Sequence, residues 1–342
     1  MNILLVYLKT PYSPQFYLER VFKRKYNIES FDFAKTPYWS DLRFILPFYI
    51  PKGFPVSAET ALRKSFFNSF SSSSINGKKT ERKVDLILEI TSSGQYHLTG
   101  YKKLKKQISE IKTILWALDV YRADQRKFML WMKNDFDYIF TTQKNFVDVF
   151  YSQSYPDFNI SFSIKKQRKN IKAYWLTYAA EPEIHRKFDL PKIYDVVFVG
   201  NINPKVYPER VKLLKLIGKK FNLKVFSGIY GLDMAKIYSQ SKIVFNKSCA
   251  GEINMRIFET LSCGSLLITD KLNKETGLEE LFQNNKHLVL YDSENDLLEK
   301  INYYLIHNSE REEIANSGYK EVLAKHTYEH RAKEMLKTIF TE

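Results

Sequence analysis

Residues 246–270 read NKSCAGEINMRIFETLSCGSLLITD, and this stretch decides the fold of the second half of the chain. It starts at the end of an apolar run over 243–246 and passes through a short polar loop that contains Gly251. A segment with helical spacing follows over 254–262, and a second apolar run over 265–269. A strand, a loop, a helix and a second strand in this order predict a parallel βαβ unit.

The same alternation extends through the whole chain. Apolar runs predict strands at 2–8, 27–33, 84–90, 112–118, 138–141, 172–176, 195–199, 224–226, 243–246, 265–269 and 287–291. Helical spacing predicts helices at 58–70, 104–110, 209–221, 234–241, 254–262, 278–282, 296–306, 310–325 and 328–340. The expected fold is therefore α/β, with two tandem Rossmann-like, doubly wound domains over 1–185 and 190–326. The C-terminal helix, at about 327–342, is expected to pack back on the first domain.

Composition excludes several classes of protein. Of the 342 residues, 44% are hydrophobic, which is enough to bury packed cores and excludes a disordered chain. Two cysteines, Cys249 and Cys263, are too few for a disulfide scaffold or a four-cysteine zinc site. They predict reduced thiols in a cytoplasmic protein.

Positive charge is concentrated in the first half of the chain. Residues 1–180 hold 29 basic and 15 acidic side chains, whereas the whole chain has a net charge of +15. The asymmetry predicts an anionic partner for the first half, and a lysine-rich coding bias with a solvated surface is the alternative. The aromatic segment over 44–54 (FILPFYIPKGF) either docks on anionic lipid or packs internally or along an acceptor cleft. We therefore expect a cytoplasmic protein, with peripheral association with the inner face of the membrane.

The loop and helix of the opening stretch have the residue types of an anion site. Ligands of doubly wound sheets bind outside the carboxyl ends of the strands. Asn254 is placed to cap the helix, Arg256 in its first turn suits phosphate oxygens, and the Glu259 carboxylate suits a vicinal diol such as ribose. The alternative is an i,i+3 ion pair between Arg256 and Glu259 on an exposed helix face, and the spacing leaves both open.

A family resemblance bears on this choice. The string N-x-R-x-F-E-x-x-x-C-G over 254–264 resembles the donor-binding segment of GT-B glycosyltransferases. More narrowly, it resembles the CgeB-like (spore-maturation type) members, which are related to glycosyltransferase family 1/4-like proteins. Three further segments resemble that family in order: 174–185 (YWLTYAAEPEIH), 195–201 (DVVFVGN) and 326–331 (HTYEHR).

The resemblance implies a nucleotide-sugar donor on the second domain and a surface-glycan, lipid-linked or protein acceptor on the first, with no nucleic acid. Glu259 resembles the second acid of the E-x7-E motif, which binds the donor ribose, and Arg256 with the helix start at Asn254 would face the diphosphate. The first acid should stand at Gly251, so Glu252 either replaces it or the acid is absent, which leaves retention or inversion open. The remaining donor-binding positions implied are Gly200, Asn201, Ser227 and Gly228.

The implied chemistry needs a stabilised diphosphate and an acceptor base. Helix dipoles and basic side chains are expected to neutralise the leaving group, so no metal and no cofactor are expected. Asp119, at the end of an apolar strand, is the first candidate for the base, and an N-cap role is its alternative. His97 is the second candidate, and His185 in the linker either touches the cleft or is exposed.

One function of another class competes with the enzyme. The basic runs over 102–106 and 165–172 stand next to aromatic residues, as they do in many proteins that bind single-stranded nucleic acid. The alternative is therefore a non-catalytic, basic α/β protein that binds nucleic acid or an anionic polymer. The sequence contains no recognised nucleic-acid-binding motif, which favours the enzyme.

Overall fold

The structure is a computed structural model that describes residues 1–8, 10–32, 74–75, 78–79, 84–92, 110–151 and 171–341. It divides into two compact units, Met1–Thr142 with Phe146–Trp175 and Gln143–Asn145 with Leu176–Glu342. The predicted helix over 58–70, nearly all of that over 104–110, the aromatic segment over 44–54 and His97 lie outside the described residues.

The first unit is built on a parallel sheet with the strand order β2-β1-β5-β6-β7-β8. The six predicted strands are confirmed as β1 (Asn2–Tyr7), β2 (Asn27–Asp32), β5 (Leu86–Thr91), β6 (Lys112–Ala117), β7 (Tyr138–Thr141) and β8 (Lys172–Trp175). Strands β3 (Ser74–Ile75) and β4 (Lys78–Lys79) form a separate antiparallel pair. The connecting elements are α1 (Pro14–Lys23), α5 (Ala123–Met132), α6 (Val147–Tyr151) and the 3-10 turns η2 (Lys133–Asp135) and η3 (Lys144–Phe146).

Helix α1 was not predicted from the spacing of its apolar residues, although local signals for it exist. Ser13 is its N-cap, and the Ser13 hydroxyl accepts a hydrogen bond from the Phe16 amide. Pro14 stands at the first helical position, where its fixed φ suits a helix start and its missing N–H costs nothing. Helix α5 was missed as well, and its N-cap residue Arg122 makes no side-chain capping bond.

The second unit has a parallel sheet with the order β10-β9-β11-β12-β13. Its strands are β9 (Tyr194–Val199), β10 (Leu223–Phe226), β11 (Ser241–Asn246), β12 (Leu266–Asp270) and β13 (Val289–Tyr291). Its helices are α7 (Pro208–Lys220), α8 (Gly231–Ser239), α9 (Met255–Ser262), α10 (Leu278–Leu281), α11 (Glu294–Ile306), α12 (Asn308–Lys325) and α13 (Tyr328–Thr341), with the 3-10 turn η4 (Lys274–Thr276). Every strand and helix predicted for this half is confirmed, within three residues at each end.

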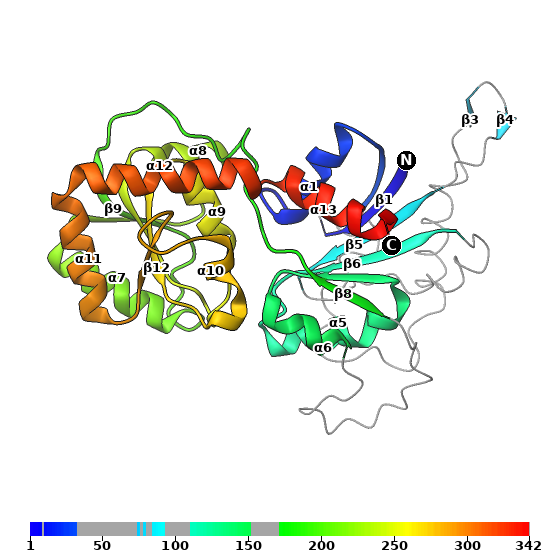
Figure 1. The fold of residues 1–342 in the computed structure, drawn as a ribbon, viewed down its shortest axis with the longest axis horizontal. Helices are drawn as coiled ribbons and strands as arrows, with labels where there is room; N and C mark the ends of the chain where they lie inside the picture. Colours follow the sequence, from blue (N-terminus) through cyan, green and yellow to red (C-terminus); the bar gives the residue numbers. More distant parts are fainter. Residues whose placement is uncertain are drawn as a thin grey trace. The chain divides into compact units, whose positions relative to one another are not determined.

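Alternation along the strands fixes how the second sheet is covered. Val196 and Phe198 of β9 pack with Leu213 and Ile217 of α7 in one buried cluster, which also includes residues of α11. The intervening Val197 is equally buried and points to the opposite face, because successive strand side chains alternate. Helices α8 and α9 contact the sheet there, and in Figure 1 strands β9 and β12 lie between α7 on one side and α8 on the other.

The strand orders locate a switch point in each sheet. In the second unit the chain moves from β9 to β10 on one side and then crosses to β11 on the other side of β9. The loops that leave β9 and β11 therefore run to opposite sides, and the carboxyl ends of these two strands are where ligands of doubly wound sheets bind. In the first unit the equivalent switch lies between β1 and β5.

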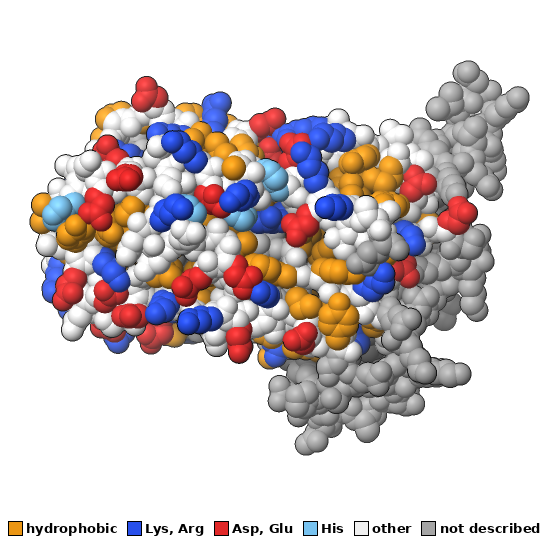
Figure 2. Space-filling model, viewed as in Figure 1, with side chains coloured by type: hydrophobic (Ala, Val, Ile, Leu, Met, Phe, Trp, Pro, Cys, Tyr) orange, Lys and Arg blue, Asp and Glu red, His pale blue; other side chains and the backbone are white. Residues whose placement is uncertain are grey.

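Surface charge and helix hydropathy bear on the predicted anionic and membrane partners. Figure 2 shows acidic and basic side chains interspersed on the face that it presents. Much of the excess positive charge of the first half is on residues outside the described ranges. No helix within the described ranges is both long and apolar enough to cross a membrane.

A substitution at Gly318 tests the packing of the second unit. A Cβ atom at Gly318 in α12 would collide with the His287 carbonyl oxygen and lie 2.8 Å from Leu261 Cδ2. We expect Gly318→Ala to lower the free energy of unfolding by about 1–3 kcal/mol. The matched control is Gly218→Ala in α7, whose Cβ would lie 3.7 Å from Leu223 Cδ2, an ordinary contact. It should raise stability by about 0.5–1 kcal/mol. Thermal denaturation of both variants checks this, and equal effects would contradict the packing described.

Candidate functional site

Arg256, in the first turn of α9, ties together the carboxyl ends of β9 and β11. Its Nε donates to the Val199 carbonyl oxygen at 2.9 Å, and its Nη1 donates to Asn246 Oδ1 at 2.5 Å. Gly200 follows β9 with φ +153°, and a Cβ atom there would collide with Arg256 Nη2. A glycine at this position therefore allows the guanidinium to lie directly against the chain at the switch point.

Arg210, on α7, supplies a second guanidinium at the same place. It is buried, and it donates to the Asn201 carbonyl oxygen at 3.1 Å and to the Lys247 carbonyl oxygen at 2.9 Å. The guanidinium carbons of Arg210 and Arg256 lie 5.4 and 4.5 Å from the centre of the Phe198 ring. We call Arg210 and Arg256 the guanidinium pair.

The guanidinium pair has acidic side chains in electrostatic range, Glu252 for Arg210 and Glu259 for Arg256, but none in direct contact. Within the described part of the chain, neither Arg210 nor Arg256 forms an ion pair with Asp or Glu. Burial lowers the pKa of Arg210, and the nearby charge of Arg256 lowers it further. Two like charges held together at the carboxyl ends of two strands favour an anion that can accept hydrogen bonds from both, such as a phosphate or diphosphate.

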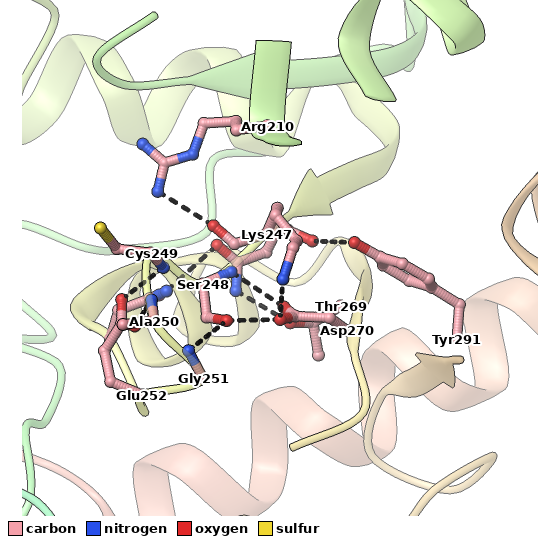
Figure 3. Close-up of polar contacts among 12 residues, drawn as sticks. Arg210, Lys247, Ser248, Cys249, Ala250, Gly251, Glu252, Thr269, Asp270 and Tyr291 are labelled. Carbon is pink, nitrogen blue, oxygen red and sulfur yellow. Dashed lines mark hydrogen bonds and ion pairs between the residues drawn. The ribbon is translucent and has the colours of Figure 1, made fainter. Parts of the chain in front are cut away.

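The loop between β11 and α9 is organised by Asp270, the last residue of β12 (Figure 3). The Asp270 carboxylate accepts hydrogen bonds from the Ser248 amide at 2.9 Å and from the Ser248 hydroxyl. It also forms an ion pair of 2.9 Å with Lys247 Nζ. The Gly251 amide donates back to Ser248 Oγ at 3.1 Å. These contacts fix the loop over 247–252 beside the guanidinium pair.

Glu252 is part of this loop rather than an open carboxylate. Its two oxygens accept the amide hydrogens of Cys249 at 2.8 Å and of Ala250 at 2.6 Å. The residue is buried, so these bonds replace the water that the charge would otherwise bind. In this arrangement the Glu252 carboxylate closes the loop on itself.

Asn254 occupies the N-cap position of α9, but its side chain does not cap the helix. No capping bond from Asn254 is formed, and its Nδ2 instead donates to Asn246 Oδ1 at 3.3 Å. The first turn of α9 therefore starts without a side-chain cap, next to Arg256. Amide groups at such a helix start attract an anion.

Glu259, one turn further along α9, is nearly buried with few partners. It is 8% exposed, and no hydrogen bond reaches its carboxylate from the residues that the structure describes. The His185 Nε2 atom lies 3.8 Å from Glu259 Oε1. Burial raises the pKa of Glu259 to about 7, and the charge of Arg256 opposes this. The alternative of an exposed ion pair between Arg256 and Glu259 is wrong, because Glu259 is buried and the two groups form no ion pair.

Comparisons with known proteins bear on the family and on the fold. Residues 183–337 match the family described as glycosyl transferase-like. Anabaena Alr3699/HepE in complex with UDP and glucose has a TM-score of 0.69 at 12% identity, with 100% of both chains covered. The chain has a GT-B fold. Sucrose-phosphate synthase from Thermosynechococcus elongatus has a TM-score of 0.62 at 11% identity, covering 99% of this chain and 98% of that one.

A third GT-B structure, a glycosyltransferase from Rickettsia africae, has a TM-score of 0.61 at 12% identity and covers 98% of this chain and 97% of its own. No curated protein sequence gives a significant match. The second unit is therefore glycosyltransferase-like, and the whole chain shares its architecture with GT-B glycosyltransferase structures.

The predicted donor-binding residues of this GT-B chain fall in two places. Gly200 and Asn201 touch the guanidinium pair, Gly200 by close approach and Asn201 through its carbonyl oxygen. Ser227 and Gly228 follow β10, the neighbour of β9 in the sheet, and both are exposed. Gly228 has φ +72° and open space around its Cα, so the chain turns there without a side chain.

The candidate base Asp119 lies at the carboxyl end of β6 in the first unit. Its φ is +42°, a left-handed conformation that is uncommon for a residue other than glycine. The N-cap of the next helix, α5, is Arg122, so the alternative role of Asp119 as an N-cap is wrong. The structure places Asp119 at the carboxyl edge of the sheet, where ligands of this fold class bind.

One D-x-D string, Asp135-Phe136-Asp137, bears on the expectation that no metal is used. Asp137 Oδ2 accepts hydrogen bonds from the Thr113 amide at 2.9 Å and from Thr113 Oγ1 at 3.0 Å. Thr113 and Asp137 stand at the amino ends of β6 and β7, which is the edge opposite the ligand-binding edge. No group of three or more His, Cys, Asp or Glu side chains among the described residues is arranged to hold a metal ion.

Two groups of site residues were not predicted from the sequence. Arg210 shares its helix face with Leu213, Leu214 and Ile217, which are all buried. A charged residue three, four and seven positions before buried apolar residues is the signal that could have identified it. The ion pair between Lys247 and Asp270 was not predicted either, because only the neighbouring strands β11 and β12 bring the two residues together.

Glu259 gives a prediction about stability. Folding raises the pKa of Glu259 from 4.5 to about 7. Below pH 4.5 the side chain is neutral in both the folded and the unfolded protein, so its burial does not lower the free energy of unfolding. Between pH 4.5 and about 7 the unfolded protein loses the proton first, so the free energy of unfolding falls as the pH rises. We expect Glu259→Gln to raise the free energy of unfolding at pH 8 by about 1–3 kcal/mol and to have little effect at pH 5. The control is Glu313→Gln on the exposed side of α12. Denaturant unfolding at both pH values measures this, and a pH-independent difference would contradict the burial of the charge.

Proposed function

We propose that this chain is a glycosyltransferase that binds the diphosphate of a nucleotide sugar at the guanidinium pair. The observation that carries the proposal is that Arg210 and Arg256 lie together at the switch point between β9 and β11, with no direct ion pair to a carboxylate of the described residues. A diphosphate has the charge and the number of acceptor oxygens to engage both guanidiniums. The uncapped start of α9 adds amide donors on the same side.

The donor ribose is proposed to bind Glu259. A carboxylate accepts hydrogen bonds from both hydroxyls of a vicinal diol, and Glu259 is one helical turn from Arg256. The pentose attached to a bound diphosphate would be within reach of that turn. Anabaena Alr3699/HepE, which has the same fold, was crystallised with UDP and with UDP-glucose, so we propose a UDP-sugar as the donor class.

The guanidinium pair would promote the reaction by stabilising the leaving group. Breaking the glycosidic bond to the diphosphate moves negative charge onto the phosphate oxygens. Fixed guanidiniums need no rearrangement to receive that charge, because backbone carbonyls and the Phe198 ring already hold them. We therefore propose that transfer is independent of a metal.

The acceptor half of the reaction is proposed for the first domain. Asp119 at the carboxyl edge of its sheet is the proposed base, with His97 as the second candidate. Glu252 is proposed to shape the donor loop, because both of its oxygens are engaged by the loop amides. The acceptor is proposed to be a surface glycan, a lipid-linked glycan or a protein.

Finer features of the resemblance are part of the same proposal. We infer a CgeB-like subtype, an acceptor domain over 1–185, a donor domain over 190–326, and a C-terminal helix that packs back on the first domain. The location is proposed to be cytoplasmic, with peripheral binding to anionic membrane. The predicted positions beside the nucleobase are Ser227 and Gly228.

The guanidinium pair is tested by nucleotide binding. We expect Arg256→Ala and Arg210→Ala each to weaken UDP binding about ten- to hundredfold, as measured by calorimetry, because each removes charge-assisted hydrogen bonds. The matched control is Arg186→Ala, which removes an exposed guanidinium of the same unit and should leave the affinity for UDP unchanged.

The same titration separates the enzyme from the competing function. Titrations at two salt concentrations, with UDP and with a single-stranded oligonucleotide, compare the two ligand classes. Strong oligonucleotide binding with a steep dependence on salt, together with no UDP binding, would contradict the glycosyltransferase proposal.

Metal independence has its own test. We expect hydrolysis or transfer of a UDP-sugar by the wild-type protein to continue at an unchanged rate after dialysis against EDTA. Loss of the activity on dialysis and its return with added Mg²⁺ or Mn²⁺ would show that a metal stabilises the diphosphate instead.

A further inference from the structure

His185 lies behind Glu259 in the interior of the second unit. It is 0% exposed, so the alternative that His185 is an exposed linker residue is wrong. The Ser262 hydroxyl, on the same helix as Glu259, donates to the His185 carbonyl oxygen. The His185 amide donates to the Glu181 carbonyl oxygen at 2.7 Å. The turn over 181–185 is thus fixed against α9.

The hydrogen bonds of the ring determine its tautomer. The Glu181 amide donates to His185 Nδ1 at 3.1 Å, so Nδ1 is an acceptor and carries no proton. Burial lowers the pKa of His185 to about 3, so the ring is neutral at physiological pH. The single ring proton is therefore on Nε2, the nitrogen that lies 3.8 Å from Glu259 Oε1.

We propose that His185 is a positioning residue that turns its Nε2–H toward Oε1 of Glu259 and so leaves the second oxygen oriented for the ribose of a nucleoside diphosphate. This inference rests on the proposed function. The imidazole dipole favours the ionised carboxylate, which is the form that accepts hydrogen bonds from both ribose hydroxyls. In many binding sites, residues that do not touch the ligand orient the groups that do, and His185 would orient Glu259 in this way.

The other groups around Glu259 do not provide this function. Those that face it electrostatically are Arg256 and Cys263 on its own helix, Tyr238 on α8 and Tyr328 on α13. Burial raises the pKa of Tyr238, Tyr328 and Cys263, so all three stay neutral between pH 6 and 8. Arg256 is bound to Val199 and Asn246. Glu259 is thus the group of this cluster that titrates near pH 7.

The experiment compares UDP with 2′,3′-dideoxy-UDP, which has the same phosphates and base but no ribose hydroxyls. Calorimetry of the wild-type protein at pH 8 should show about ten- to hundredfold tighter binding of UDP. His185→Phe keeps a planar ring but has no hydrogen-bond donor. We expect this variant to lose most of the ratio between the affinities for UDP and for dideoxy-UDP. His185→Gln retains an N–H donor and should restore a large part of it.

The pH profile of the ratio separates positioning from structural support. In the wild type the UDP to dideoxy-UDP affinity ratio should rise with pH through about 7, as Glu259 ionises. In His185→Phe the midpoint should move to higher pH, because no donor favours the carboxylate. Taking the ratio cancels the titration of the phosphates, which both nucleotides share.

Controls make each outcome decisive. Ser262→Ala removes the hydroxyl that holds the His185 backbone and leaves the imidazole donor in place, so it should retain the ratio. A ratio and midpoint unchanged in His185→Phe, or both nucleotides weakened equally, would overturn the inference while leaving the proposed function intact. If His185→Phe does not fold, the test rests on His185→Gln. Equal affinities for UDP and dideoxy-UDP in that variant would also overturn the inference. Absence of UDP binding to the wild type would instead overturn the proposed function.

Discussion

The candidate site depends on two guanidiniums that make no direct ion pair with any carboxylate in the described part of the chain. Arg210 and Arg256 come from different helices, and each bonds to backbone or amide oxygens where strands β9 and β11 end. The carbonyl dipoles and the Phe198 ring offset part of the cost of taking these charges out of water. They supply no full negative charge in contact with the guanidiniums, and for this reason an anion is the ligand we propose for the site. The strand order determines where this can occur, because β9 and β11 are the strands between which the connections diverge.

The two acids near the guanidinium pair are in opposite states. Both carboxylate oxygens of Glu252 are engaged by loop amides, which is the arrangement of a structural charge. Glu259 is almost as deeply buried, but it has no hydrogen bond from the described residues. A group that is buried at a cost and receives no hydrogen bond favours the binding of a ligand more than it stabilises the fold. For this reason the contrast between Glu252 and Glu259 supports a ligand-binding role for Glu259 more strongly than the presence of either acid in a motif does.

The sequence was sufficient for the sheets and for part of the site. Runs such as the one over 265–269 identify buried strands, because parallel strands covered on both faces are almost uniformly apolar. Arg256 and Glu259 were identified because they stand in one short motif. Arg210 and His185 are 46 and 74 residues from those partners, and only the packing of α7 and of the turn over 181–185 on the sheet and on α9 brings them together. Local pattern reveals residues that act within one element, whereas a site assembled from several elements requires the fold.

The loop over 247–252 limits how a diphosphate can bind. Its amides at Cys249 and Ala250 resemble a phosphate cradle, but Glu252 occupies both with bonds of 2.8 and 2.6 Å. A phosphate there would have to displace a buried carboxylate and leave it without partners, which costs more than two amide bonds return. The guanidinium pair and the uncapped first turn of α9 have no such internal competitor. We therefore expect a diphosphate to gain most from the arginines. Arg210 is held by the Lys247 carbonyl oxygen of the loop, and Arg256 is held by Asn246 at the end of β11.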